Sequence, residues 1–344
     1  MKKEPLFDTT NINVYPLAYE EFYNDNFPLR SRYIKLFNSF NLNILDKSPV
    51  PDQVIIGKEG WLYFANEELD IYKGKNRFSE KELEEFRLEL DYRTNYLEKL
   101  GIKYYFMVAP SKSTIYPEYM PVSVVQENKE SWGEQLINYL NKKSVVKTIN
   151  VYTTLRANSK KENLYYKIDN HWNMLGGFYG ANEIIRVMKK DFPQLSTHKL
   201  SEYSIKKEQI KEGNLSKMFS GSGNFRDVRC FFTPKKGRKA VEVAKKYPVI
   251  KNFSMINDYE KTMEIKDSHK PKILIITDSF GAHAYEFLSE EFSRSVKIFD
   301  AWNYMLNEDI VLKEKPDIVL LISFEPRLRY LLKNQSRLKN IEKK

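Results

Sequence analysis

Cysteine is almost absent from this chain of 344 residues, which carries only Cys230. A single cysteine excludes an internal disulfide, and the lack of a Cys/His cluster around it removes the usual zinc-binding patterns. The neighbours of Cys230 are mostly apolar, with Phe231 and Phe232 directly after it. This setting predicts a buried strand position for Cys230 rather than a reactive thiol, and it leaves the redox compartment open.

Long apolar runs are also lacking. No segment approaches the roughly 20 apolar residues that are needed to span a bilayer. The first five residues, Met1 to Pro5, do not start the apolar segment of a signal peptide. The chain as written is therefore expected to be soluble, without a signal or transmembrane segment, and whether an export segment was removed is left open.

Acidic residues are outnumbered, with 46 Asp and Glu against 56 Lys and Arg, for a net charge of +10. Such a balance can indicate nucleic acid or another polyanion as a partner. The basic residues gather in 235–239, 245–246 and 337–344, however, and no stacking aromatics are interleaved with them. We therefore expect a solvated surface and no nucleic-acid partner, with an anionic polymer or a membrane surface as the weaker alternative.

Apolar runs alternate with segments of helical periodicity over most of the chain. This alternation predicts an α/β protein, built as a three-layer sandwich with a mostly parallel five-stranded sheet. The expected strands are 102–109, 145–151, 272–277, 295–299 and 317–322. The expected helices are 79–100, which a capping box begins, then 132–140, 176–188, 281–290, 304–312 and one that starts near Pro326.

Three further segments lie outside this alternation. Residues 1–50 hold one amphipathic helical stretch and no sheet pattern, which predicts an N-terminal arm. Residues 54–64 form two apolar runs around a Gly-bounded turn, which predicts a hairpin. Residues 196 to about 270 are irregular and charge-rich, and we interpret them as an insertion that shapes a pocket wall. The simplest division is an arm over 1–50 and one domain over 51–344.

The expected strand 272–277 leads into Asp278-Ser279-Phe280-Gly281 and then at once into a helix. A small hydroxyl residue at the carboxyl end of a buried parallel strand lies where open α/β sheets bind their ligands. Ser279 is therefore a candidate nucleophile, and its alternative role is that of a helix N-cap. A serine hydroxyl needs a neighbouring base to take its proton.

Only four histidines can supply that base. His269 precedes the same strand, and about ten extended residues would separate it from Ser279 by roughly 30 Å. His283 follows on the departing helix and would need an unusual first turn to reach back. His198 has no neighbouring carboxylate in the sequence and resembles a surface loop residue.

His171 differs, because Asp169 stands two residues before it in Asp169-Asn170-His171-Trp172. The carboxylate can hold one imidazole nitrogen while the other faces the serine. Trp172 is placed to wall such a site from water. A metal site at Asp169 and His171 is the alternative, but further ligands at a recognisable spacing are lacking, so no metal is expected.

Several blocks of the chain resemble, in the same order, the AlgX/AlgJ-type polysaccharide O-acetyltransferases and their DHHW-type relatives, which are similar to the Ser-Gly-Asn-His (SGNH) hydrolases. These blocks are 26–30, 56–62, 110–112 with 116–118, 169–172 and 278–280. The resemblance implies an SGNH hydrolase-like, circularly permuted catalytic domain, because the Asp-x-His block precedes the serine. It carries over Ser279, His171 and Asp169 as a catalytic triad.

The same resemblance implies no cofactor, a polysaccharide acceptor and an acetyl donor that a membrane acyltransferase hands over. It also implies a location outside the cytoplasm, in the periplasm or at the cell surface. The chain departs from the family in two blocks, Thr277-Asp278-Ser279 and Gly213-Asn214-Leu215, which leaves the oxyanion hole open. The backbone N–H of Ser279 is the first candidate donor. Lys112, Arg327 and Trp172 are weaker oxyanion or substrate-binding candidates.

The expected function is therefore an O-acetyltransferase that moves an acetyl group to hydroxyls of an exported polysaccharide through an acetyl-serine. A carbohydrate acetylesterase is the close alternative, because the triad does not decide whether sugar or water accepts the acetyl group. A non-catalytic glycan-binding or assembly protein is the alternative from another class, and the 23 Tyr and 21 Phe would suit sugar stacking.

Overall fold

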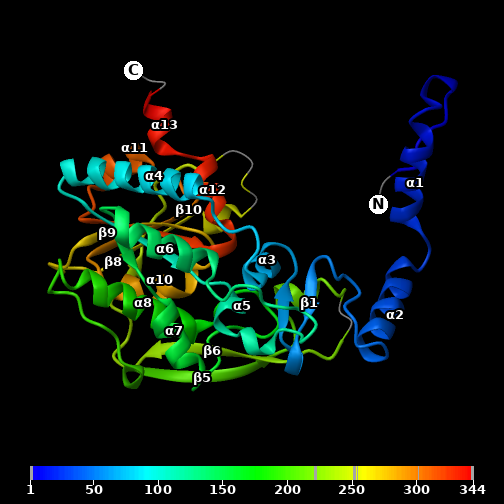
Figure 1. Cartoon of the computed structure of the whole chain (residues 1–344), viewed down its shortest axis with the longest axis horizontal. Helices are drawn as coiled ribbons and strands as arrows, with labels where there is room; N and C mark the ends of the chain where they lie inside the picture. Colours follow the sequence, from blue (N-terminus) through cyan, green and yellow to red (C-terminus); the bar gives the residue numbers. More distant parts are fainter. Residues whose placement is uncertain (1–2, 221–222, 251–252, 254, 301, 342–344) are drawn as a thin grey trace.

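A seven-stranded sheet forms the centre of the computed structural model, which describes residues 3–220, 223–250, 253, 255–300 and 302–341 (Figure 1). The five strands from β4 to β10 run parallel, and β8 and then β7 are added through antiparallel pairs. In spatial order the strands are β4 (Lys147–Ile149), β3 (Lys103–Ala109), β11 (Ile318–Phe324), β9 (Lys272–Thr277), β10 (Arg294–Phe299), β8 (Glu260–Glu264) and β7 (Val241–Glu242).

The α/β class is confirmed, and all five predicted strands are present and mutually parallel. The prediction of a five-stranded sheet is wrong, because β8 and β7 make it a mixed sheet of seven strands. These two strands lie at one edge and carry charged residues, among them Glu260 and Lys261, so they lack the unbroken apolar run of a strand buried on both faces. Both lie within 196–270, so this stretch also extends the main sheet.

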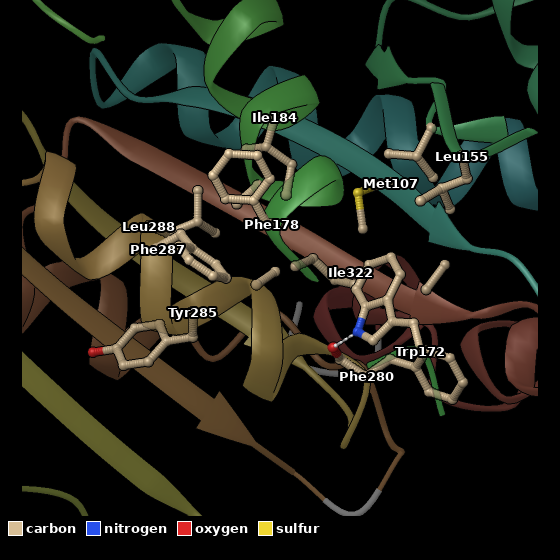
Figure 2. Packing of buried hydrophobic residues seen from close by; sticks show 14 of the residues in the cluster. Met107, Leu155, Trp172, Phe178, Ile184, Phe280, Tyr285, Phe287, Leu288 and Ile322 are labelled. Carbon is tan, nitrogen blue, oxygen red and sulfur yellow. Dashed lines mark hydrogen bonds between the residues drawn. The ribbon is translucent and has the colours of Figure 1, made fainter. Parts of the chain in front are cut away.

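Helices cover both faces of the sheet and give three layers. Side chains alternate along β3, where Phe106 and Val108 join one apolar cluster and Tyr105 and Met107 join the other. The first cluster contains side chains from α4 (Glu80–Lys99), α6 (Trp132–Lys143), α11 (Glu308–Glu314) and α12 (Leu328–Lys333). The second contains side chains from α7 (Tyr152–Ser159), α8 (Met174–Met188) and α10 (Gly281–Leu288), and Figure 2 shows part of it.

Helix ends follow local capping. The predicted capping box at the start of α4 is confirmed, with Ser79 as its N-cap. The helix predicted from 176 starts at Met174, because the Asn173 side chain accepts hydrogen bonds from the next backbone N–H groups. The helix predicted over 304–312 starts only at Glu308, since the carboxylate of Asp300 binds the N–H groups of Tyr304 and Met305 and holds a loop there.

The remaining elements lie around this core. The predicted hairpin is confirmed as β1 (Val54–Ile56) with β2 (Leu62–Phe64), and Cys230 is buried in the ribbon of β5 (Tyr203–Ile210) and β6 (Asp227–Pro234). The other α-helices are α1 (Tyr15–Asn26), α2 (Arg30–Asn43), α3 (Glu67–Lys73), α5 (Lys112–Ile115), α9 (Asn214–Lys217) and α13 (Ser336–Ile341). The 3-10 helices are Thr9–Asn11, Lys58–Gly60, Pro117–Tyr119, Leu200–Glu202, Ile256–Asp258, Ser289–Glu291 and Glu325–Arg327.

The first two helices lead away from the rest of the molecule (Figure 1). The division into an arm over 1–50 and one domain over 51–344 stays a prediction. Among the described residues, no helix combines the length and the apolar character that a membrane crossing requires.

A buried carboxylate ties the end of β11 to the end of β3. Glu325 is fully buried, and its two oxygens accept hydrogen bonds from the backbone N–H groups of Ser111 and Gly133 and from the hydroxyls of Thr114 and Tyr152. Four donors stabilise this carboxylate away from water. Glu325 therefore fixes the segment that follows β3 at the carboxyl edge of the sheet.

Replacement of Glu325 by glutamine tests this tie. Glu325→Gln keeps the shape of the side chain but turns an acceptor oxygen into an amide that faces donors. We expect the free energy of unfolding in urea to fall by about 1–3 kcal/mol. The control Glu127→Gln removes an exposed partner of Lys75. It is expected to change the free energy of unfolding by less than about 0.5 kcal/mol. Equal effects of the two substitutions would contradict the structural role of Glu325.

Candidate active site

Ser279, His171 and Asp169 lie together at the carboxyl edge of the sheet. The Oγ of Ser279 is 2.8 Å from Nε2 of His171, and Nδ1 of His171 is 2.7 Å from Oδ1 of Asp169. Both distances are within hydrogen-bond reach. The chain of contacts requires the tautomer in which Nδ1–H donates to Asp169 and Nε2 accepts from the serine hydroxyl. This is the arrangement in which a histidine can take a proton from a serine nucleophile.

The serine turn is held by the buried carboxylate of Asp278. One of its oxygens accepts from the N–H of Phe280 at 2.8 Å, and the other accepts from the N–H of Phe324 at 2.7 Å and from the hydroxyl of Tyr304 at 2.5 Å. Burial raises the pKa of Asp278, and these hydrogen bonds offset part of that rise. Asp278 thus joins the end of β9 to the end of β11 and to the loop before α11.

Aromatic side chains brace the same turn. The ring of Phe280 stacks on that of Phe324, with centroids 4.0 Å apart, and lies 4.8 Å from the imidazole centroid of His171. The indole N–H of Trp172 donates to the backbone oxygen of Phe280 at 2.8 Å (Figure 2). Trp172 is fully buried. It therefore supports the serine turn from within the core, and the predicted role of Trp172 in substrate binding stays a prediction.

Asp169 is oriented by backbone donors. Its Oδ1 also accepts from the N–H of His171 at 3.0 Å, and its Oδ2 accepts from the N–H of Asn214 at 2.8 Å. Burial raises the pKa of Asp169, but the hydrogen bonds and charge of His171 together with the Asn214 N–H outweigh burial and hold this pKa well below its usual value. The carboxylate is therefore ionised at neutral pH.

The contact from Asn214 was not predicted, because a backbone N–H leaves no side-chain signature in a sequence. The only signal was the Gly213-Asn214-Leu215 block. A β-carbon on Gly213 would lie 2.5 Å from the backbone oxygen of Ile168, so glycine is what allows this segment to approach the Asp169 loop.

Lys112 holds the Asp169 loop from the other side. Its side chain is fully buried, and Nζ donates to the backbone oxygens of Tyr166, Lys167 and Asp169 at 3.0, 3.1 and 2.7 Å. These bonds use all three N–H groups of the ammonium, which leaves none for an oxyanion. Burial lowers the pKa of Lys112 to about 8, against the raising effect of Glu68 and other carboxylates, so it remains largely charged at neutral pH.

A cavity of about 570 Å³ opens beside His171 and Asp169. One wall comes from β6, within the stretch that was interpreted as a pocket wall. The lining residues are Tyr166, Asp169, His171, Met174, Arg229, Cys230, Phe231, Phe232, Thr233, Arg238, Ala282, His283 and Glu286. Arg327 is not among them, and one of its guanidinium nitrogens donates to the Tyr330 hydroxyl at 3.3 Å. No group of three or more His, Cys, Asp or Glu side chains within the described ranges could hold a metal ion.

Two other histidines are His283, which belongs to α10, and His198, which packs against α10. His283 lines the cavity, and its Nδ1 is buried with no hydrogen-bond partner among the described residues. Burial, followed by the charge of His171, lowers the pKa of His283 to about 4. His198 is half-buried and bonds the backbone oxygen of Phe287 and the hydroxyl of Tyr203, so it is more deeply packed than a surface loop residue. Among the described residues, the histidine that bonds the Ser279 hydroxyl is His171.

Comparisons with known proteins agree with the resemblance read from the sequence. The family model described as "SGNH hydrolase-like domain, acetyltransferase AlgX" matches residues 54–302. The probable alginate O-acetylase AlgJ of Pseudomonas syringae pv. tomato is 24% identical over 182 residues, which are 52% of this chain and 44% of that protein. The match thus covers less than half the length of this curated relative.

Two solved structures share the fold. Bacillus cereus PatB1, determined with a sulfonyl adduct, is 18% identical with a TM-score of 0.59, over 80% of this chain and 97% of that one. The O-acetyltransferase domain of Pseudomonas putida AlgJ is 14% identical with a TM-score of 0.53, over 83% of this chain and 95% of that one. These likenesses support an SGNH hydrolase-like α/β fold.

Removal of the Lys112 ammonium should loosen the loop that carries Asp169 and His171. Lys112→Met leaves three backbone oxygens without their donor, so we expect the kcat for an acetyl ester to fall about 10- to 100-fold through misplacement of the loop, with KM nearly unchanged. Steady-state kinetics measure both constants. The control Lys58→Met removes an exposed ammonium that bonds one backbone oxygen and should leave kcat unchanged. A rise in KM alone would indicate substrate binding instead.

Protonation of His283 should destabilise the fold in acid. Its folded pKa is about 4, below the value of about 6.5 in an unfolded chain. The unfolded state therefore binds more protons between these pH values, and stability falls as the pH drops through this window. Between pH 6.5 and 4, the free energy of unfolding of the wild type should therefore fall by about 1–2 kcal/mol more than that of His283→Gln. This figure allows for the partial exposure of the side chain. Urea titrations at each pH test this, and His269→Gln, at an exposed site, should follow the wild type.

Proposed function

The chain belongs to the family of AlgX-type SGNH hydrolase-like acetyltransferase domains, and from this premise we propose that it transfers acetyl groups to hydroxyls of an exported polysaccharide. The observation that carries the proposal is the continuous hydrogen-bond chain from Ser279 through His171 to Asp169. The relatives named as an alginate O-acetylase and an O-acetyltransferase domain support the reaction type. The proposal includes a location outside the cytoplasm and an acetyl donor supplied by a membrane acyltransferase, both of which rest on the family resemblance.

In the first half-reaction, the Oγ of Ser279 attacks the carbonyl carbon of the acetyl donor. Nε2 of His171 takes the hydroxyl proton and delivers it to the leaving group as the bond between the acetyl and that group breaks. Asp169 is ionised and accepts the Nδ1–H bond, so it stabilises the imidazolium that forms. The backbone N–H of Ser279, just before the first turn of α10, is the proposed donor to the developing oxyanion.

In the second half-reaction, a sugar hydroxyl replaces the leaving group. Nε2 of His171 takes its proton, the hydroxyl oxygen attacks the acetyl carbon, and Ser279 leaves and recovers the proton. The cavity beside His171, at about 570 Å³, is within the usual range of small-molecule sites and has room for a sugar ring. An acetylesterase would use the same residues with water as the acceptor, and a glycan-binding protein would use the cavity alone.

The serine role is tested by turnover of a chromogenic acetyl ester. Ser279→Ala should lower kcat by on the order of a thousandfold or more, whereas Ser31→Ala on the exposed face of α2 should not change it. A sulfonyl fluoride should leave its sulfonyl group on the peptide that contains Ser279, with loss of hydrogen fluoride, in the wild type and not in Ser279→Ala. Activity of Ser279→Ala within a few-fold of the wild type would favour the glycan-binding alternative.

The fate of the acetyl group separates transfer from hydrolysis. With the same ester and an added oligosaccharide, mass spectrometry should detect acetylated sugar that is absent with Ser279→Ala. Release of free acetate only, at the same rate with and without the oligosaccharide, would contradict transfer and favour the esterase.

A further inference from the structure

Exposed apolar side chains concentrate in the N-terminal segment. Of the 27 large hydrophobic side chains that are exposed among the described residues, 15 lie between Leu6 and Leu45. The helix α1 has no buried residue at all. An isolated helix of about 12 residues is marginal in water, and a contiguous exposed apolar surface usually marks an interaction site. The segment therefore needs a partner to cover it.

The helix α2 is anchored to the body of the protein by a buried side chain. The buried amide of Asn38 donates to the backbone oxygen of Phe219 at 3.0 Å. At the elbow between the helices, the ring of Phe27 lies between those of Tyr23 and Tyr33, at centroid distances of 5.5 and 6.0 Å. Figure 1 shows α1 continuing away from α2 beyond this elbow. The apolar side chains of α1 are thus presented to solvent rather than to the chain's own α2.

The two helices carry opposite charges. The acidic residues of α1 are Glu20, Glu21 and Asp25, and it has no Lys or Arg, whereas α2 carries Arg30, Arg32 and Lys35 and has no Asp or Glu. A cavity of about 690 Å³ lies along α2, lined by Leu29, Arg32, Tyr33, Lys35, Leu36, Ser39 and Gly223. This groove combines apolar and basic side chains, which is the complement of the apolar and acidic surface of α1.

We propose that α1 of one copy packs along the α2 groove of a second copy, and reciprocally, so that the chain forms a symmetric dimer through its N-terminal helices. In such an isologous contact, each copy contributes its α1 and its α2, so the dimer contains two equivalent α1–α2 contacts. Each contact covers exposed apolar side chains of both helices. Helices that lie on anionic membranes carry Lys and Arg on the polar face. The three acidic residues of α1 would be repelled by such a membrane, which argues against a membrane surface as the partner. A second copy supplies both complementary charges.

Reciprocal charge reversal tests the dimer. One variant carries Glu20→Lys and Asp25→Lys, which makes both helices basic, and the other carries Arg30→Glu and Arg32→Glu, which makes both acidic. Sedimentation equilibrium should find a dimer of the wild type, and each variant alone should dissociate with a constant on the order of a hundredfold higher. An equimolar mixture of the two variants should recover the dimer, because each helix then meets one of opposite charge.

The remaining outcomes decide against the dimer. A monomeric wild type, variants that dimerise as well as the wild type, or a mixture that stays monomeric would each overturn it. A wild type that is monomeric but sediments with phosphatidylglycerol vesicles would assign the helices to a membrane surface instead. Glu127→Lys, an exposed reversal on the body of the protein, should leave the dimer unchanged, and ester turnover confirms that every variant is folded.

Discussion

The ammonium of Lys112, buried against three backbone oxygens, is the interaction on which the geometry of the site depends. Removal of a charge from water costs several kcal/mol unless hydrogen bonds replace its hydration. Here the backbone oxygens of Tyr166, Lys167 and Asp169 accept these hydrogen bonds in place of water. If the loop moved away, the buried ammonium would lose its hydrogen-bond partners. These bonds fasten the loop with Asp169 and His171 to the segment after β3, although the loop contains no regular secondary structure apart from one β-bridge.

The parallel sheet explains why this ammonium can reach the loop. Strands β3, β11 and β9 are neighbours, and the segments that leave their carboxyl ends carry Lys112, Glu325 and Ser279. Glu325 fixes the segment after β3, and Asp278 fixes the turn after β9 against β11. A site made from residues 108 positions apart, Ser279 and His171, is thus assembled on one rigid edge. The strands fix the points from which these segments leave the sheet, and the side-chain bonds of Lys112, Glu325 and Asp278 hold the segments beyond it.

How much was predictable from the sequence differs between the parts of the structure, for physical reasons. Strands buried on both faces leave apolar runs, so all five parallel strands were found, whereas the charged edge strands β7 and β8 were not. Ser279, His171 and Asp169 were selected because few residue types can do this chemistry and only four histidines were available. Contacts through the main chain, such as the N–H of Asn214 on Asp169 and the carbonyls on Lys112, leave no pattern. The late start of α11 was missed because Asp300 stabilises a loop.

The charge state around His171 bears on both proposed half-reactions. In the proposed mechanism, His171 is neutral before it accepts a proton and carries a positive charge afterwards. The ionised Asp169 stabilises that charge, while His283, which lines the same cavity, has a pKa of about 4 and is neutral at physiological pH. A second positive imidazole at this place would oppose the imidazolium of His171 in each proton transfer. The burial that lowers the pKa of His283 therefore keeps the cavity free of a charge that would compete with His171 in the proposed mechanism.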